Sequence, residues 1–180
     1  MKKLIAIMLC LIMLPGCAAV AETAEKTHLA KVNMGGAFEL KCALPEGYEI
    51  SEIESTDSTY VASIMSDQTR PRMYLSIAYN ELYADIARFN DMNAETVALI
   101  EKTFESEEEV EITYTETAHG TKLMMVKEVK DAVDFVDFYS VYQGYEIEIV
   151  VTAANESGLT DEQIQMAVDF LSELDFVAAE

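Results

Sequence analysis

The sequence predicts an α+β fold, in which an antiparallel β-sheet built from hairpins packs against two amphipathic helices. The longest hairpin signal is Asp134 to Ala153, DFVDFYSVYQGYEIEIVVTA, where two β-rich runs flank Gln143-Gly144. Residues 93–104 and 160–174 carry apolar side chains at helical spacing. Several other runs alternate apolar and polar residues, as half-buried strands do. The predicted element order is β-β-β-α-β-β-β-β-α.

The main hairpin has one register that separates an apolar face from a mixed face. With a two-residue loop, the apolar face carries the opposed pairs Tyr142–Tyr145, Ser140–Ile147, Phe138–Ile149 and Val136–Val151. The mixed face carries Val141–Glu146, Tyr139–Glu148, Asp137–Val150 and Phe135–Thr152. A slip of one residue would exchange the faces of a whole strand. We expect the apolar face to pack on helix 160–174, and the mixed face either to hold a site or to be covered by helix 93–104.

The first 21 residues are predicted to be an export signal. Lys2-Lys3 precede an apolar run, Leu4 to Leu14, that is shorter than the about 20 residues a membrane-spanning helix needs. Two processing sites compete. Leu14 to Cys17 resembles a lipobox, in which Cys17 is lipidated, whereas Ala19 to Ala21 fits ordinary cleavage after Ala21. Both predict an extracytoplasmic protein, either secreted or lipid-anchored to the outer face of the cell membrane.

The folded domain is expected to span residues 37–177. Residues 22–36 are polar, end in two glycines and predict a flexible tether. The first strand places Phe38, Leu40, Cys42 and Leu44 on one face and ends at the Pro45 to Gly47 turn. Cys10 leaves with the leader and Cys17 is removed or lipidated, so Cys42 has no disulfide partner and is predicted to be a buried structural thiol.

The rest of the domain follows in order. Residues 51–58 predict a loop, residues 58–66 a strand and residues 67–70 a hairpin loop, before a strand that buries Met73, Leu75, Ile77 and Tyr79. Asn93 is the expected N-cap of the first helix. Residues 110–129 predict a third hairpin turning at His119-Gly120, which pairs Tyr114 with Met125, Glu116 with Leu123 and Glu111 with Glu128. Thr160 and Gln163 form a predicted capping box for the last helix.

The charge of the chain limits its partners. The sequence holds 33 acidic and 12 basic residues, for a net charge of −21, and two of the basic residues lie in the leader. Such a surface repels nucleic acid and anionic membranes, so neither is an expected partner except through a lipid anchor. Cations and basic proteins or peptides remain compatible, although the charge also serves solubility alone.

Chemical motifs are sparse. The two histidines, His28 and His119, are expected in the tether and at a hairpin tip, and no hydrolase, zinc, redox or phosphate-loop motif occurs. No cofactor or metal site is predicted, and the acidic run 105–109 lacks calcium-loop spacing. The remaining candidates are four polar residues of the mixed face, Asp137, Tyr139, Glu146 and Glu148. A carboxylate pair among them is the one catalytic option left for a hydrolase.

The motif F-x-L-x-x-x-L-P-x-G-Y at Phe38 to Tyr48, the tandem hairpins and the closing helix resemble the PsbP-like fold. An extrinsic photosystem subunit and a Ran-binding import factor share that fold. The chain is also similar to small exported proteins of anaerobic Gram-positive bacteria with no assigned activity. The resemblance covers residues 37–177, places Tyr48 where a Trp is frequent, and carries over no catalytic residue. A cystatin-like or ferredoxin-like sheet is the alternative fold.

The sequence therefore favours an exported, non-catalytic extracytoplasmic module that binds a protein, peptide or cation at the mixed face of the sheet or at a hairpin edge. The alternatives are a hydrolase that uses a carboxylate pair on that face and a purely structural envelope protein.

Overall fold

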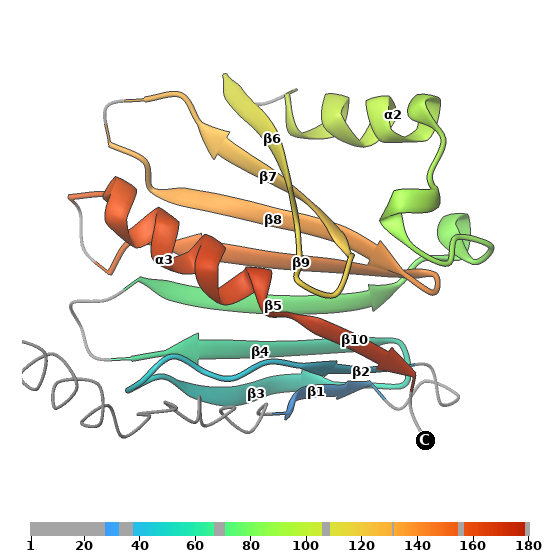
Figure 1. Cartoon of the computed structure of the whole chain (residues 1–180), viewed down its shortest axis with the longest axis horizontal. Helices are drawn as coiled ribbons and strands as arrows, with labels where there is room; N and C mark the ends of the chain where they lie inside the picture. Colours follow the sequence, from blue (N-terminus) through green and yellow to red (C-terminus); the bar gives the residue numbers. More distant parts are fainter. Residues whose placement is uncertain are drawn as a thin grey trace, which may run out of the picture.

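An antiparallel sheet of seven strands forms the centre of the computed structural model (Figure 1). The structure describes residues 28–32, 38–66, 71–105, 109–130, 132–154 and 157–178. The sheet has the order β3-β4-β5-β9-β8-β7-β6. Its strands are β3 (Glu49–Ser55), β4 (Thr59–Met65), β5 (Arg72–Tyr79), β6 (Val110–Glu116), β7 (Lys122–Glu128), β8 (Phe135–Tyr142) and β9 (Tyr145–Thr152). The predicted leader, with Cys17 and Ala21, lies outside the described residues.

The two faces of this sheet are covered by different elements. One face packs against helix α3 (Asp161–Ser172) and a small sheet of three strands, β1 (His28–Val32), β2 (Phe38–Lys41) and β10 (Asp175–Ala178). The other packs against helix α2 (Ala94–Phe104) and the short helix η2 (Phe89–Asp91), which follows η1 (Glu81–Tyr83). Antiparallel strands with two helices confirm the α+β class.

The main hairpin, β8–β9, has the predicted register at all eight pairs, from Phe135–Thr152 to Tyr142–Tyr145. Gln143 and Gly144 have φ angles of 50° and 82°, so both central loop residues are left-handed, as a tight two-residue hairpin requires. Alternation along the strands then sends Asp137, Tyr139 and the two glutamates to the side opposite α3.

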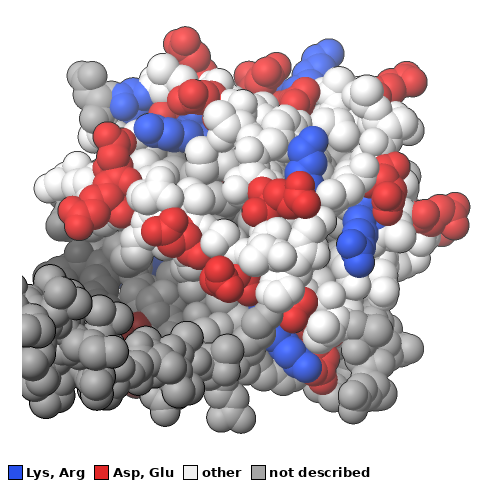
Figure 2. Space-filling view, in the orientation of Figure 1, with Lys and Arg blue, Asp and Glu red and all other residues white. Residues whose placement is uncertain are grey.

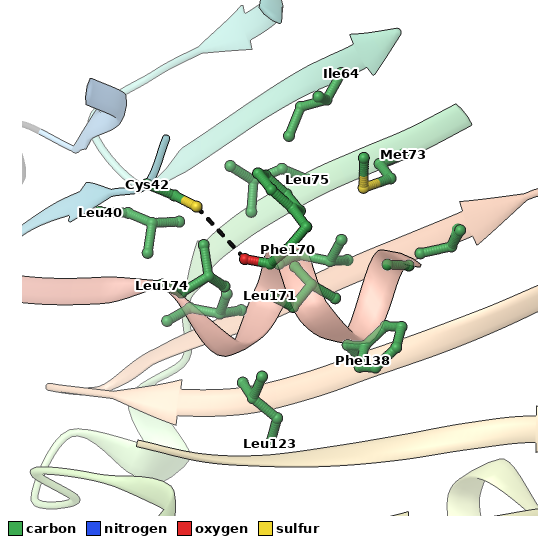
Figure 3. Close-up of a cluster of buried hydrophobic side chains, with 14 of the residues drawn as sticks. Leu40, Cys42, Ile64, Met73, Leu75, Leu123, Phe138, Phe170, Leu171 and Leu174 are labelled. Carbon is green, nitrogen blue, oxygen red and sulfur yellow. Dashed lines mark hydrogen bonds between the residues drawn. The ribbon is translucent and has the colours of Figure 1, made fainter. Parts of the chain in front are cut away.

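The α3 side holds the larger core (Figure 3). Phe138 and Leu171 are 1% and 0% exposed, which confirms that the apolar face of the hairpin packs on the C-terminal helix. The Cys42 thiol is fully buried and lies 3.5 Å from the carbonyl oxygen of Phe170. Cys42 is thus the buried structural thiol that the sequence predicts.

Both predicted helix caps are present. The Asn93 side chain accepts a hydrogen bond from the backbone N–H of Thr96 at 2.9 Å. Thr160 and Gln163 form the reciprocal capping box, with N···O distances of 3.3 and 3.0 Å. These contacts satisfy backbone donors that the first turn of a helix leaves free, and they fix where α2 and α3 begin.

Two expectations about the strands are wrong, and one further strand was not predicted. Residues 28–32, inside the predicted tether 22–36, form β1 and pair with β2, and the rest of that range lies outside the described residues. The predicted loop 51–58 is largely the edge strand β3, whose mostly exposed side chains gave no alternation of apolar and polar residues. Strand β10 follows α3 and pairs with the other side of β2. All three are short or polar strands held by backbone hydrogen bonds to a neighbouring strand. The pattern of apolar and polar side chains in the sequence does not reveal such pairing.

The third hairpin, β6–β7, is shifted by one residue from the predicted register. Tyr114 faces Met124 and Glu116 faces Lys122, while Glu111 faces Lys127 instead of another glutamate. The loop closes with a hydrogen bond from the Gly120 N–H to the Thr117 carbonyl at 2.9 Å, and Gly120 has a φ of 79°. A three-residue loop with a left-handed glycine therefore replaces the predicted two-residue loop, and it opposes unlike charges.

Candidate functional site

Helix α2 covers only part of the mixed face. Tyr139 and Val141 of β8 are buried in a second core with Phe89, Met92, Ile100, Met124 and Val126. The Phe89 and Phe104 rings lie 6.0 and 5.9 Å from the Tyr139 ring, both edge-on. The cover thus lies over β7 and β8, and the polar residues of β9 lie at its border.

A pocket of about 340 Å³ lies at this border, between α2 and strands β5, β9 and β8. The sheet contributes Glu146 and Glu148 from β9, Tyr139 from β8 and Ser76 from β5. Ile100, Thr103 and Phe104 of α2, with Tyr83 of η1, complete the opposite wall. The pocket therefore combines two carboxylates with three aromatic rings.

Hydrogen bonding and burial set the electrostatics of the pocket. The Tyr139 hydroxyl donates to Oε1 of Glu146 at 2.8 Å. Burial, and then this glutamate, raise the pKa of the Tyr139 phenol, so the proton stays on the phenol. Burial, and then the charge of Glu146, raise the pKa of Glu148. Two neighbouring carboxylates thus face one small space with limited access to water.

Asp137 lies on the same sheet face, beside the pocket rather than in its lining. Its residue surface is 8% exposed, and its Oδ1 atom has no hydrogen-bond partner within the described part of the chain. Burial, and then the charges of Glu148 and Glu128, raise the pKa of this carboxyl to about 7. A buried acid of this kind holds its proton under mildly acidic conditions.

Two lysines of the described chain form ion pairs away from the pocket. Lys130 contacts Glu128 at 2.8 Å and Asp134 at 2.9 Å, and Lys127 lies 3.9 Å from Asp161. Within the described ranges, no lysine, arginine or histidine forms an ion pair with Glu146 or Glu148. On the α3 side, red acidic side chains are dispersed among blue basic ones (Figure 2). The pocket is therefore distinguished by two partly buried carboxylates without an ion-pair partner in the described chain, not by the general acidity of the chain.

The structure brings together three of the four predicted face residues, Tyr139, Glu146 and Glu148, and sets Asp137 next to them. Sequence reasoning missed the facing wall, above all Tyr83 and Thr103. The apolar stripe of helix 93–104 included Phe104 and so carried part of the signal. Tyr83 lies in a stretch without periodicity, and Thr103 is polar, so neither carried a pattern.

Other chemistry gains no support from the described residues. They hold no group of three or more His, Cys, Asp or Glu side chains arranged to bind a metal ion. No helix among them is long and apolar enough to cross a membrane. His119 lies at the tip of the β6–β7 hairpin, as predicted, with its Nδ1 atom 3.6 Å from Asp175.

Comparison with known proteins gives no match. No protein-family model, curated protein or solved structure matches this chain.

Proposed function

We propose that the protein is an exported, non-catalytic binding module and that the pocket between α2 and the sheet is its ligand site. The observation that carries the proposal is that the partly buried Glu146 and Glu148 line a half-open pocket of about 340 Å³ without a counter-charge in the described chain. A volume near the lower end of ligand pockets suits one side chain or a small molecule. The class of ligand is a cation, or a protein or peptide that presents one, because buried carboxylates are stabilised by an opposite charge.

The arrangement is preorganised for binding. Glu146 already accepts the Tyr139 hydroxyl hydrogen bond, so this pair is held in one geometry before any ligand arrives. The carboxylate wall comes from a strand pair, which is a rigid support for a recognition site. Preorganisation of this kind reduces the entropy lost when a ligand binds.

A selection from a random peptide library, with calcium titration in parallel, tests this proposal. The purified protein should enrich ligands whose binding perturbs the NMR signals of Tyr139 and Thr103 and is lost in a Glu146→Gln, Glu148→Gln double variant. A Glu162→Gln variant, which changes an exposed glutamate of α3 away from the pocket, is the matched control and should keep binding. If neither a peptide nor calcium binds in a way that the double variant abolishes, the proposal is wrong.

A hydrolase is the second candidate, and one observation favours it. Two carboxylates line one cleft, and the pKa of Glu148 is raised, as the acid of a carboxylate pair requires. This candidate predicts turnover of glycoside substrates that is lost in a Glu148→Gln or a Glu146→Gln variant. Turnover that survives Glu148→Gln, or its absence across a glycoside panel, would remove the candidate.

Export itself is part of the proposal. The leader pattern supports it, and the mass of the native protein distinguishes its two forms. Lipidation would leave a diacylated chain that begins at Cys17, whereas release would leave a chain that begins at Glu22. A native protein that still begins at Met1 would contradict export.

We also propose that the fold is PsbP-like. The central antiparallel sheet with a helix on each face supports this assignment. An experimental structure whose strand order differs from that of PsbP-like proteins would contradict it. The assignment adds nothing to the proposed function, since one fold serves many functions.

A further inference from the structure

We infer that the pocket takes the side chain of a lysine or arginine residue of a peptide, whose apolar stem lies on the aromatic wall while its charged end meets Glu146 and Glu148. This inference rests on the proposed function and names its ligand. It follows from the composition of the two pocket walls, from the volume of the pocket and from the contact of Lys122 with aromatic rings elsewhere on the same sheet face.

The carboxylate wall calls for a positive charge. Glu146 and Glu148 are alternate residues of β9, so their Cα atoms lie about 7 Å apart. Their mutual repulsion and partial burial disfavour two negative charges in this space. A cation between them would relieve that repulsion, and an ammonium or guanidinium group can donate a hydrogen bond to each carboxylate.

The opposite wall calls for an apolar stem. Tyr83 and Phe104 face the pocket as rings, and Ile100 adds an aliphatic surface. Lysine and arginine bury their methylene stems along apolar surfaces and place their charges over aromatic faces. A neutral apolar side chain would leave the carboxylates without a partner, so both walls are satisfied only by a ligand with both parts.

The space does not suit a bare metal ion. Calcium takes six to eight oxygen ligands within roughly 2.6 Å, which two carboxylates on one wall do not supply. The described residues contain no cluster of three or more metal-ligating side chains. The volume of about 340 Å³ fits a long side chain instead.

The same face already holds the charge of one lysine over aromatic rings. Lys122 places its Nζ atom 4.0 Å from the centroid of the Tyr114 ring and 5.9 Å from that of Phe89. Phe89 also packs edge-on against Tyr139, which lines the pocket. The aromatic cluster under α2 thus has one side that holds an internal lysine and one side that opens to the pocket.

Asp137 adds a reason for an external cation. Its unpartnered Oδ1 atom is buried on the sheet face that the pocket shares, and its carboxyl interacts with the charge of Glu148. A buried oxygen without a hydrogen-bond donor is unusual in folded proteins. A positive charge at Glu148 would offset the accumulated negative potential of Glu148 and Asp137 together.

Calorimetry with capped tripeptides tests the inference on the full purified protein. The central residue of the tripeptide is lysine, arginine or norleucine, and spermidine and calcium chloride are separate titrants. We expect lysine or arginine tripeptides to bind at least about tenfold more tightly than the norleucine tripeptide, since charge-assisted hydrogen bonds are lost in the latter. Glu148→Gln should weaken this binding by about tenfold or more, and the control Glu162→Gln should not.

Folding of the variants is checked separately by urea unfolding. Gln is nearly isosteric with Glu, and because burial raises the pKa of Glu148, a neutral amide there should not lower stability. The inference would be overturned if the norleucine tripeptide bound equally well, or if binding survived Glu148→Gln. It would also be overturned if spermidine or calcium bound and none of the tripeptides did. Calcium binding that the Glu146→Gln, Glu148→Gln double variant abolishes would overturn it while leaving the proposed function intact.

Discussion

The two faces of the β8–β9 hairpin come from the same two strands but differ in composition and burial. The α3 face presents Phe138, Ile147 and Ile149, each at most 2% exposed, to a helix that itself buries four residues. The opposite face mixes Tyr139 with carboxylates, and α2 buries only Ile100 of its own residues. Alternation along a strand makes this division possible, because neighbouring residues meet different partners.

The difference teaches how one sheet can carry both a core and a site. Burial of large apolar side chains on the α3 face supplies much of the favourable free energy of folding. That surplus allows the other face to retain Asp137 without a hydrogen-bond partner for its Oδ1 atom in the described chain, and two carboxylates at one pocket. We therefore expect substitutions on the first face to change stability and substitutions on the second to change binding and pH response.

The largest effect is expected on the α3 face. Leu171→Ala should lower the free energy of unfolding by about 2–5 kcal/mol, because it removes a fully buried side chain and leaves a cavity among Leu75, Phe138 and Leu174 (Figure 3). Leu99→Ala on α2 is the control: its side chain is 63% exposed, and its effect should stay within about 0.5 kcal/mol. Urea unfolding measures both, and equal losses would break the comparison.

A pH-dependent effect is expected on the α2 face, at Asp137. Its pKa of about 7 in the folded protein exceeds the usual value of about 3.9 for an unfolded chain. The folded state therefore binds more protons between these values, and the free energy of unfolding falls as the pH rises through that window. Relative to an Asp137→Asn variant, the wild type should lose roughly 2–3 kcal/mol from about pH 5 to about pH 8.

Urea unfolding at the two pH values measures this difference. The charged groups that face Asp137 are Glu148 of β9 and Glu128 of β7, and Lys130 is paired with Glu128. Asp85→Asn, which changes an exposed carboxylate, is the control and should show no such trend. A stability difference between wild type and Asp137→Asn that does not change with pH would show that the carboxyl titrates in its usual range.

Part of this architecture could be predicted from the sequence because local patterns specify it. The register of β8–β9 follows from a two-residue loop with Gly144 and from one apolar face that a slip would destroy. The caps Asn93 and Thr160 follow from side chains that can bond to the backbone of the next turn. In each case a few neighbouring residues contain the whole physical reason.

The wrong predictions concern features that depend on residues outside their own stretch of sequence. Strand β1 exists because β2 offers a free edge, and β3 because β4 does, although its side chains stay mostly exposed. The β6–β7 register depended on one more loop residue than the His119-Gly120 pair suggested. Local composition contains none of this information.

The candidate site was predictable only as a set of side chains. Alternation placed Asp137, Tyr139, Glu146 and Glu148 on one face, which the structure confirms as a geometric statement. Whether that face is covered depends on where α2 comes to rest, and the pocket exists because α2 covers β7 and β8 but not all of β9.

The smallest expected effect compares the two helices through their caps. Asn93→Ala and Thr160→Ala each remove a side-chain acceptor from a helix start and should each cost about 1 kcal/mol. The helices should differ in how they respond, because α3 buries Ile164, Ala167, Phe170 and Leu171, whereas α2 buries Ile100. Amides of α2 should therefore exchange with solvent through a local opening, and those of α3 only through global unfolding.

Native-state hydrogen exchange should show Asn93→Ala speeding exchange in α2 alone, while Thr160→Ala lowers protection throughout the sheet. Equal protection of the two helices in the wild type would mean that α2 is as firmly packed as α3 and that the pocket wall is not the looser side of the molecule.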